Sequence, residues 1–278
     1  MKIIDLHIHT NHSDGTYSVN EIFQKASDEN ISAISITDHD TISAIPDACR
    51  ISEEYNIEFI AGIEFSCIYK NYNLHILGYG FDYKNEEFAT KLKSIAESRI
   101  IRNKLIVEKL KNYNIFIDYN ELEKTSKGTL TRANIAKQMV DKGYSFSIKD
   151  AFLKYLDYDA PCYVKREKIQ AEYIIDMIHK AGGVAFLAHV NQIKTSRFNL
   201  ENLILELKEL GLDGIEAFYP EYSDKTLSFC NEVCEKFSLL KSGGSDFHGK
   251  IRDNSFGYIS KDVYIPYEFL EKIKNKLG

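Results

Sequence analysis

Residues 3–15 read IIDLHIHTNHSDG and place three histidines and two aspartates around a short apolar run. Apolar and polar residues alternate through its first half, which is typical of a strand, because successive side chains of a strand point to opposite faces. Asp5, His7 and His9 therefore share one face of the predicted strand. A single His-x-His pair arises often by chance and does not by itself indicate a site.

A turn and a helix follow this strand. Asn11 to Gly15 are turn-forming residues, and Ser18 with Glu21 matches a capping box, which predicts a helix from Val19. The first unit of the chain is therefore a strand, a polar loop and a helix.

The same unit recurs along the chain, with polar residues again at the ends of apolar segments. Alternating strands and helices with chemistry at the carboxyl ends of the strands are typical of a parallel α/β barrel. The sequence predicts at least six such units. The later segments are 31–37 before His39, 58–66 with Glu64, 74–79 around His75, 183–188 before His189, 212–218, and 239–245 before Asp246 and His248.

Six of the eight histidines fall at these strand ends or on the face that they share. With three carboxylates they offer more nitrogen and oxygen ligands than one ion needs, and the number suits two or three divalent ions. The absence of thiolates favours Mn, Fe or Zn, and the many imidazoles disfavour Mg or Ca. The candidate ligands are His7, His9, Asp14, His39, Glu64, His75, His189, Asp246 and His248.

Other polar residues near these ends are expected to have supporting roles. Asp5 and Asp38 are expected to orient ligand imidazoles, because metal-bound histidine usually donates its other N–H to a carboxylate or carbonyl. Asp40 is expected to help start the following helix. His12, in the first loop, and His179, solvent-facing on a helix, are left out of the ligand set.

Composition excludes several classes of protein. The length of 278 residues suits one α/β barrel-sized domain, alone or with an insert, and the five scattered cysteines suggest neither disulfides nor a thiolate zinc site. A net charge of −6 argues against capture of duplex nucleic acid and leaves small or single-stranded anionic substrates. No apolar run approaches the ~20 residues of a membrane span, and no signal peptide precedes the first strand, so a soluble, cytoplasmic protein is expected. The oligomeric state is not indicated.

Adjacent divalent ions about 3.5–4 Å apart polarise a phosphoryl oxygen and hold a hydroxide for in-line attack. Phosphate ester hydrolysis is therefore the expected chemistry. Binuclear amide hydrolysis uses similar ligands on similar barrels, and the residues alone leave it open as a competitor.

Six short motifs, DLHIHTNHSDG, ITDHD, GIEFS, LHILGY, FLAH and GSDFH, stand in the order found in one known family. The chain resembles the PHP (polymerase and histidinol phosphatase) family of metal-dependent phosphoesterases, from its first residues to about Gly257. The resemblance implies a distorted (β/α)7 barrel of the TIM-like type. It also implies a trinuclear site, with manganese as the expected ion and iron or zinc as alternatives.

The resemblance further implies how the ligands divide among the ions. One ion would lie among His7, His9, Glu64 and Asp246, a second among Glu64, His75 and His189, and a third among Asp14, His39 and His248. The catalytic metal-bound hydroxide would be held by Asp14, His39, Glu64, His189 and His248.

Residues 86–164 do not fit the barrel rhythm and are predicted to form an inserted helical cap, with residues 1–85 and 165–278 forming the barrel domain. Helices are expected over residues 87–113, 132–142 and 148–156. The stretch LTRANIAKQMVDKGYS, followed by AFLKYL and APCYV, resembles the subgroup of nucleoside 3′,5′-bisphosphate phosphatases and 5′-to-3′ exoribonucleases that trim short RNAs.

In that subgroup the arginine that matches Arg132 reaches the substrate phosphate, a role that suits a permanently charged, bidentate guanidinium. Its alternative role is that of an exposed arginine at a helix start. Asn134, where the subgroup commonly has histidine, is the second substrate-binding candidate. Residues 190–192, Val-Asn-Gln, stand where a Pro-Gly-Arg-like turn is common, and Lys165, Arg166 and Arg197 are weak candidates to supply the missing cation.

The expected function is a phosphatase or phosphodiesterase that acts on a small phosphorylated nucleotide or the 5′ end of a short oligonucleotide. Histidinol phosphate phosphatase is the nearest enzymatic alternative, because it shares the barrel and the ligand types. A catalytically silent metal-binding module is the alternative from another class, and the complete ligand set argues against it.

Overall fold

The computed structural model describes residues 2–125, 128–165, 169–252, 254–261 and 263–278. Its strands are β1 (Ile3–Ile8), β2 (Ile31–Ile36), β3 (Glu58–Phe59), β4 (Gly62–Tyr69), β5 (Tyr72–Tyr79), β6 (Ile169–Gln170), β7 (Val184–Leu187), β8 (Gly214–Phe218), β9 (Leu240–Gly243), β10 (Tyr258–Ser260) and β11 (Val263–Tyr264). Its α-helices are α1 (Val19–Asp28), α2 (Ile45–Tyr55), α3 (Glu86–Lys111), α4 (Tyr119–Thr125), α5 (Arg132–Asp141), α6 (Ile148–Ala151), α7 (Ala171–Lys180), α8 (Arg197–Glu209), α9 (Asp224–Phe237) and α10 (Glu268–Leu277).

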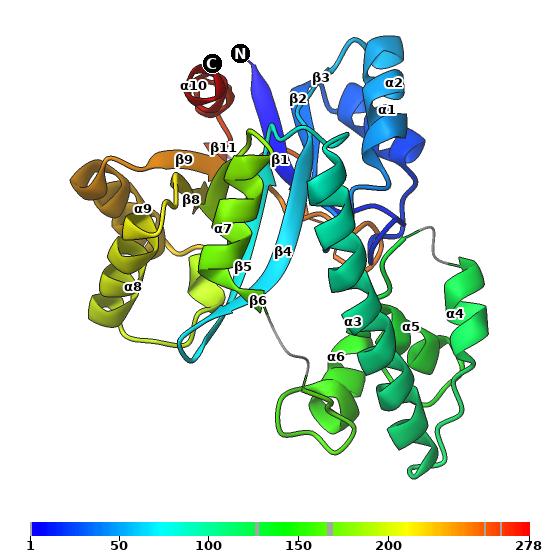
Figure 1. Cartoon of the computed structure of the whole chain (residues 1–278). Coiled ribbons are helices and arrows are strands. Elements are labelled where there is room, and N and C mark those ends of the chain that lie inside the picture. The colour runs from blue at the N-terminus through cyan, green and yellow to red at the C-terminus, as the bar shows by residue number, and fades with distance from the viewer. Residues whose placement is uncertain (1, 126–127, 166–168, 253, 262) are drawn as a thin grey trace.

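The larger strands form two sheets with helices around them (Figure 1). One sheet has the order β1-β2-β3 and the other β6-β4-β5-β7-β8-β9. Most neighbouring strands are parallel, but β5 runs antiparallel to both β4 and β7. The expectation of a wholly parallel arrangement is therefore wrong at β5. Only Lys70 and Asn71 separate β4 from β5, and Lys70 has a φ of 50°, so this tight turn reverses the chain where a parallel pair needs a long crossover.

Isolated backbone bridges join the two sheets. Ile8 pairs with Phe247, just after β9, and His39 pairs with Glu64 in β4. The carboxyl ends of β1, β2 and β9 therefore meet near the start of β4, which brings the polar residues of four distant segments together.

The described helices largely follow the sequence prediction. Ser18 caps α1 and forms the predicted capping box with Glu21. In the middle of the chain, α3, α5 and α6 correspond to the three predicted helices, although α6 continues as the π-helical turn Phe152–Leu156. The short helix α4 was not predicted individually, since its seven residues are too few to show a clear apolar period.

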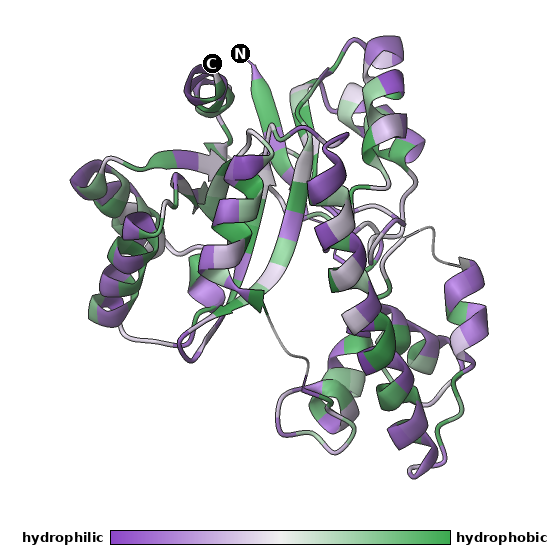
Figure 2. Ribbon diagram, in the orientation of Figure 1, coloured by the Kyte–Doolittle hydropathy of each residue, from purple (hydrophilic) through white to green (hydrophobic). Residues whose placement is uncertain are grey.

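Apolar residues gather in the strands and on the inner faces of the helices, while the outer faces are hydrophilic (Figure 2). A separate hydrophobic cluster runs from Ile106 in α3 to Cys162, within the segment that is predicted to be an insert. The first half of α3 instead packs Phe88, Leu92 and Ile95 into the main core. One helix therefore contributes to both clusters. Among the described residues, no helix is long and apolar enough to cross a membrane.

Candidate metal centre

The first two predicted ligands come from the end of β1. His7 and His9 are fully buried, and their Nε2 atoms lie 3.2 Å apart. They share one face, as the alternation of residues 3–15 predicts, because a strand points alternate side chains to the same side.

Glu64, in β4, lies at the centre of the cluster. It is 1% exposed, and imidazole nitrogens from several segments approach its two carboxylate oxygens. One oxygen lies 2.6 Å from His75 Nδ1 and 2.9 Å from His189 Nε2, and the other 3.0 Å from His39 Nδ1, 3.2 Å from His9 Nε2 and 3.5 Å from His7 Nε2. A single carboxylate thus faces most of the predicted histidine ligands.

Asp14 and Asp246 complete the cluster on its other sides. Asp246 Oδ1 lies 3.2 Å from His9 Nε2 and 3.5 Å from His248 Nδ1, and Asp14 Oδ1 lies 3.3 Å from His248 Nε2. Asp14 Oδ2 lies 3.7 Å from His39 Nε2. The structure therefore brings all of the predicted ligands into one cluster.

The donor atoms of this cluster fit divalent metal ions. Three groups have ligand atoms within 4.8 Å of one another: His9, Asp14, His39 and His248; His7, His9 and Asp246; and His39, Glu64 and His75. Each group combines imidazole nitrogen with carboxylate oxygen, the donors that Mn, Fe and Zn accept. His189 does not fall in these groups, but its Nε2 is 3.2 Å from His75 Nδ1.

The electrostatics of the cluster favour ionised carboxylates. Burial raises the pKa of Asp14, but the charges of His39 and His248 outweigh it and hold that pKa far below its usual value. Burial lowers the pKa of His9, yet its contacts with Asp246 and Glu64 raise the pKa to about 10. The carboxylates are thus in the form that binds cations.

Glu216, in β8, contacts two of the predicted ligand residues and is not among the candidates that the sequence indicates. One of its oxygens lies 2.8 Å from His7 Nδ1, and the other accepts the backbone N–H of His189 at 2.6 Å. It is fully buried. A lone glutamate inside an apolar strand was the signal available in the sequence, because such a residue is rarely buried without a partner.

The expectation that Asp5 and Asp38 orient ligand imidazoles is wrong, because the hydrogen bonds of their carboxylates go to backbone N–H groups and hydroxyls. Both carboxylates hold the backbone and loops around the cluster, and Glu216 performs the orienting role at His7. Asp5 accepts the backbone N–H groups of His7, Ser245 and Gly257, and Asp38 accepts the backbone N–H of Thr10 and the hydroxyls of Thr10 and Ser13.

Asp40 does not start a helix, contrary to expectation. Its Oδ2 lies 2.6 Å from Nη2 of Arg99 in the middle of α3, and its Oδ1 accepts the backbone N–H of Ser66. Arg99 also donates to the Ser66 hydroxyl, which lies 3.3 Å from His75 Nε2. Arg99, which the sequence did not indicate, therefore contacts the segments that carry His39 and Glu64.

Strained backbone marks three strand ends in the site. Asp40, His189 and Asp246 have φ angles of 51°, 25° and 51°. Such conformations cost about 1–3 kcal/mol each in non-glycine residues and persist where surrounding contacts determine them. The ion pair with Arg99 holds the backbone of Asp40 in this conformation, and the hydrogen bond to Glu216 holds that of His189.

Asp246 has two further partners that the sequence did not indicate. Its Oδ2 accepts a hydrogen bond of 3.0 Å from the hydroxyl of Tyr219 and another from Nη1 of Arg252. Arg252 Nη2 in turn donates to Tyr219, and so does the side chain of Gln192. Gln192 belongs to the 3₁₀ turn Val190–Gln192, which stands in place of the Pro-Gly-Arg-like turn.

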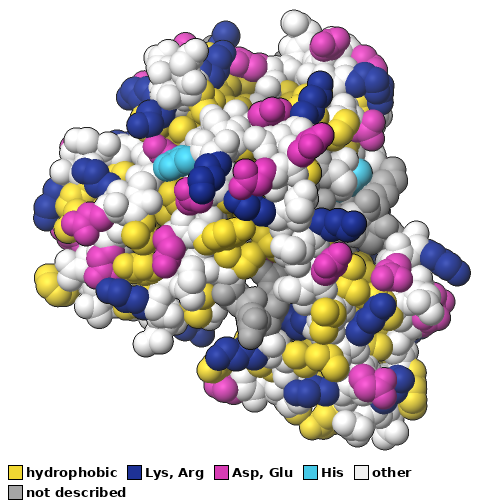
Figure 3. Space-filling view, in the orientation of Figure 1, with side chains coloured by type: hydrophobic (Ala, Val, Ile, Leu, Met, Phe, Trp, Pro, Cys, Tyr) yellow, Lys and Arg dark blue, Asp and Glu magenta, His cyan; other side chains and the backbone are white. Residues whose placement is uncertain are grey.

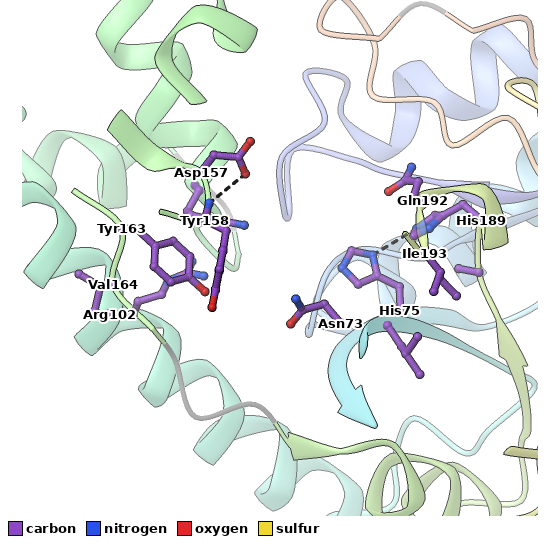
Figure 4. A pocket seen from close by; sticks show the side chains of 13 residues that line it. Asn73, His75, Arg102, Asp157, Tyr158, Tyr163, Val164, His189, Gln192 and Ile193 are labelled. Carbon is purple, nitrogen blue, oxygen red and sulfur yellow. Dashed lines mark hydrogen bonds between the residues drawn. The ribbon is translucent and has the colours of Figure 1, made fainter. Parts of the chain in front are cut away.

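Arg132 lines two cavities that border the cluster. The larger of the two has a volume of about 310 Å³ and lies between Tyr158 and Tyr163 on one side and His75 and His189 on the other (Figure 4). The smaller, of about 170 Å³, is lined by Asp14, His39 and His75. Both open onto predicted metal ligands.

Arg132 is held in place by the insert. Its Nη1 donates to the carbonyl of Leu156 at 2.8 Å, and its guanidinium lies over the rings of Phe152 and Tyr163. Burial lowers its pKa. Arg132 is therefore a partly buried group at the cavities, unlike the exposed surface arginine of the alternative.

Asn134 lies elsewhere. Its Nδ2 donates to the carbonyl of Ser13, and its Oδ1 accepts the backbone N–H of Thr131, whose hydroxyl donates to Asp14. These bonds attach the start of α5 to the loop after β1. Asn134 lines a third cavity, of about 330 Å³, with Asp14 and Lys137.

The remaining candidates stand apart from the two cavities. Lys165 is exposed, and Arg166 lies outside the described residues. Arg197 begins α8 and forms an ion pair with Glu232 at 2.6 Å. His12 is buried against Ser43, and His179 is exposed and pairs with Asp213.

The model of the PHP domain family matches residues 5–220. The chain belongs to the PHP domain family. A 5′-3′ exoribonuclease from Haemophilus influenzae is 31% identical over 247 residues, which cover 89% of this chain and 90% of the relative. A 3′,5′-nucleoside bisphosphate phosphatase from Chromobacterium violaceum is 29% identical over 250 residues, 89% of this chain and 88% of that protein.

A solved structure shares the fold of this PHP domain. It is an amidohydrolase from Chromobacterium violaceum with bound sulfate and no metal, with a TM-score of 0.88 and 26% identity. The match covers 98% of this chain and 96% of that structure. The resemblance to the PHP family is confirmed, as is the prediction of a phosphoesterase, since both curated relatives are phosphoester hydrolases by name.

Proposed function

We propose that this PHP domain protein hydrolyses phosphate ester bonds at the end of a small nucleotide or of a short 5′-phosphorylated RNA. The proposal is carried by the convergence of imidazoles and carboxylates beside cavities lined by Arg132. A buried guanidinium binds phosphate oxygens through paired hydrogen bonds and so orients the group to be hydrolysed. The two curated relatives act on substrates of these classes, as their names state.

We also propose that the cluster holds two or three divalent ions, with manganese expected and iron or zinc as alternatives. Nitrogen and oxygen donors without thiolates support this choice. Such ions, when bound, polarise a phosphoryl oxygen and neutralise charge on the leaving oxygen. The chain's own part is to fix the ligands, as Glu216 does for His7. The proposed ligands remain His7, His9, Asp14, His39, Glu64, His75, His189, Asp246 and His248.

We also propose that the two sheets together form one distorted (β/α)7 TIM-like barrel. Residues 86–164 form its inserted cap, and residues 1–85 and 165–278 form the barrel domain. The isolated bridges between the sheets and the separate hydrophobic cluster of the insert support this division. The cap then supplies Arg132, and the barrel supplies the metal ligands.

A small or single-stranded substrate is consistent with the charge of the protein. Basic and acidic side chains are interspersed on the face shown in Figure 3, and the net charge is −6. Duplex nucleic acid is bound mainly through many phosphate contacts, which favour a basic surface. A cytoplasmic location stays a prediction.

Three alternatives are tested by the same experiment. The first is a histidinol phosphate phosphatase, which would use the same types of metal ligand. The second is a catalytically silent protein that binds metal at the cluster. The third is an amide hydrolase, because one structural neighbour is named as an amidohydrolase. The place of Arg132 at the cavities favours a phosphorylated substrate over an amide. The names of the two relatives favour a nucleotide over histidinol phosphate.

The experiment measures product release from purified protein supplemented with manganese. The panel contains adenosine 3′,5′-bisphosphate, AMP, histidinol phosphate, a short 5′-phosphorylated RNA and an N-acyl amino acid, with His39→Ala as the control. We expect phosphate from the bisphosphate or nucleotides from the RNA, and loss of both in the control. Activity on histidinol phosphate alone or on the amide alone would overturn the proposal. Inactivity on the whole panel with metals bound would favour the silent module.

A further inference from the structure

Arg252 lies in the loop between β9 and β10 and contacts two of the predicted metal ligands. Its Nη1 donates to Asp246 Oδ2, and its backbone carbonyl accepts the N–H of His248 at 3.2 Å. The backbone N–H of Arg252 in turn donates to the carbonyl of Gly249, whose φ of 70° allows the tight turn between them. One residue, outside the six sequence motifs, therefore holds both ligands of this loop.

The two carboxylate oxygens of Asp246 have different neighbours. Oδ1 belongs to the cluster, where it lies 3.2 Å from His9 Nε2 and 3.4 Å from His7 Nε2. Oδ2 instead accepts hydrogen bonds from Tyr219 and Arg252. A carboxylate oxygen accepts about two hydrogen bonds, so two donors occupy Oδ2 fully. Asp246 is therefore held with Oδ1 as the oxygen that is available to a metal ion.

The guanidinium of Arg252 is also fixed through its other terminal nitrogen. Its Nη2 donates to the Tyr219 hydroxyl at 2.6 Å and to the carboxylate of Glu221, and both of these residues follow β8. The side chain of Gln192 donates to the same hydroxyl at 3.0 Å. Rotation of the Asp246 carboxylate would therefore break several hydrogen bonds that support one another.

The bond to Asp246 is the contact that gives Arg252 its importance. Glu221 is 53% exposed, and exposed ion pairs contribute little to stability. The side chain of Asp246 is 6% exposed and Tyr219 is fully buried, so the contact with Asp246 is shielded from water. Charge-assisted hydrogen bonds are the strong ones in proteins, and this one acts directly on a predicted ligand.

We infer that Arg252 is a positioning residue of the metal site, which holds Asp246 so that Oδ1 alone is presented beside His7 and His9. The inference rests on the proposed metal site and adds to it a cation that is not itself a ligand. Partners of this kind orient metal ligands, and their loss usually lowers metal affinity. Tyr219 assists Arg252 through the second hydrogen bond to Oδ2.

The test measures manganese binding to the purified protein by competition with a chelating dye. Arg252→Ala should weaken binding at one site by about 10- to 100-fold. In an Asp246→Asn background the same change should alter binding at the remaining sites by less than about threefold, because the carboxylate through which Arg252 acts is gone. Lys250→Ala, an exposed lysine of the same loop, is the control for a lost positive charge and should leave the affinity unchanged.

Cobalt-substituted protein provides a spectroscopic readout that does not depend on turnover. Arg252→Ala frees Oδ2, so the carboxylate can bind through both oxygens and the coordination number can rise. The visible absorption of bound cobalt should then fall, because six-coordinate cobalt absorbs more weakly than four- or five-coordinate cobalt. Tyr219→Phe should change the spectrum in the same direction and by less, since Arg252 remains.

Equal losses of affinity with and without the Asp246 carboxylate, or a cobalt spectrum like that of wild type, would overturn the role of Arg252. Failure of wild type to bind metal would overturn the proposed metal site and this inference with it. Inactivity with metal bound would instead count against the proposed reaction alone, because both readouts are independent of hydrolysis. If Arg252→Ala does not fold, as judged by circular dichroism, Arg252→Gln replaces it.

Discussion

Arg99 and Asp40 form a buried ion pair, with Nη2 and Oδ2 2.6 Å apart, although 59 residues separate them in the sequence. Their side chains are 6% and 1% exposed. Asp40 follows His39 at the end of β2, and Arg99 lies in the middle of α3. The pair therefore ties α3, the longest of the described helices, to a segment that carries a predicted metal ligand.

Replacing Arg99 with methionine should destabilise the protein by about 3–5 kcal/mol, because it leaves the Asp40 carboxylate buried without its partner. Urea unfolding of the variant and of Arg50→Ala measures the effect. The exposed Arg50 forms surface pairs only, so its removal should cost less than about 1 kcal/mol. The double variant Arg99→Met/Asp40→Asn should be more stable than the sum of the single changes predicts. Similar midpoints for Arg99→Met and Arg50→Ala would show that the pair contributes little.

Glu216→Gln should weaken metal binding by about 10- to 100-fold, since the carboxylate that orients His7 becomes a neutral amide. Competition with a chelating dye measures the affinity for manganese. Glu209→Gln, at the exposed end of α8, is the control for a lost negative charge. Equal affinities for the two variants would remove Glu216 from the metal site.

Arg132→Ala should lower kcat/KM on phosphorylated nucleotides by about 100-fold while the metal content stays unchanged, because its guanidinium lines the cavities and is held by the carbonyl of Leu156. Arg132→Lys should recover little of the loss, since an ammonium lacks the bidentate geometry. Arg197→Ala serves as the control, because Arg197 pairs with Glu232 away from the cavities. If kcat/KM of Arg132→Ala equalled that of Arg197→Ala, Arg132 would be excluded from the substrate site.

His179 gives a prediction for pH, in a place remote from the cluster. Its hydrogen bond with Asp213, 2.7 Å long, raises its pKa above the usual value near 6.5. A histidine with a raised folded-state pKa adds stability that is fully present below its unfolded pKa and is lost as pH rises through the folded pKa. The side chain is 38% exposed, so the effect should stay below about 1 kcal/mol.

Thermal unfolding of wild type and His179→Gln between pH 5.5 and about 8.5 checks this assignment. The Tm difference should be largest at the acid end and shrink as pH rises above about 6.5. Parallel curves would show that the Asp213 contact does not depend on the charge of His179.

Local patterns were sufficient to predict which residues gather in the candidate cluster. His7 and His9 follow from strand alternation, and His189 and Asp246 follow from their place after buried runs, because parallel strands end at the same edge of a sheet. Patterns of this kind report which residues share a face or an edge. They do not report which strand reverses, so β5 was placed in the wrong direction.

Partners from distant segments could not be predicted in the same way. Glu216 and Arg99 act through contacts 209 and 59 residues away, and nothing in their own neighbourhood indicates those contacts. Asp5, Asp38 and Asp40 are the converse case. Their place beside histidines suggested local roles, but their carboxylates bind backbone and side-chain groups supplied by the tertiary fold.

Because α3 packs into two hydrophobic clusters, it couples the unfolding of the insert to that of the main core. Its first half packs Phe88 and Leu92 into the main core, while Ile106 and Leu110 pack into the cluster of the insert. A fluctuation that releases the insert must either break the helix or carry it away from the sheets, and both expose apolar side chains. Where α3 stays intact, the amide hydrogens in its middle should exchange with solvent only when both clusters unfold together, as members of one cooperative unit.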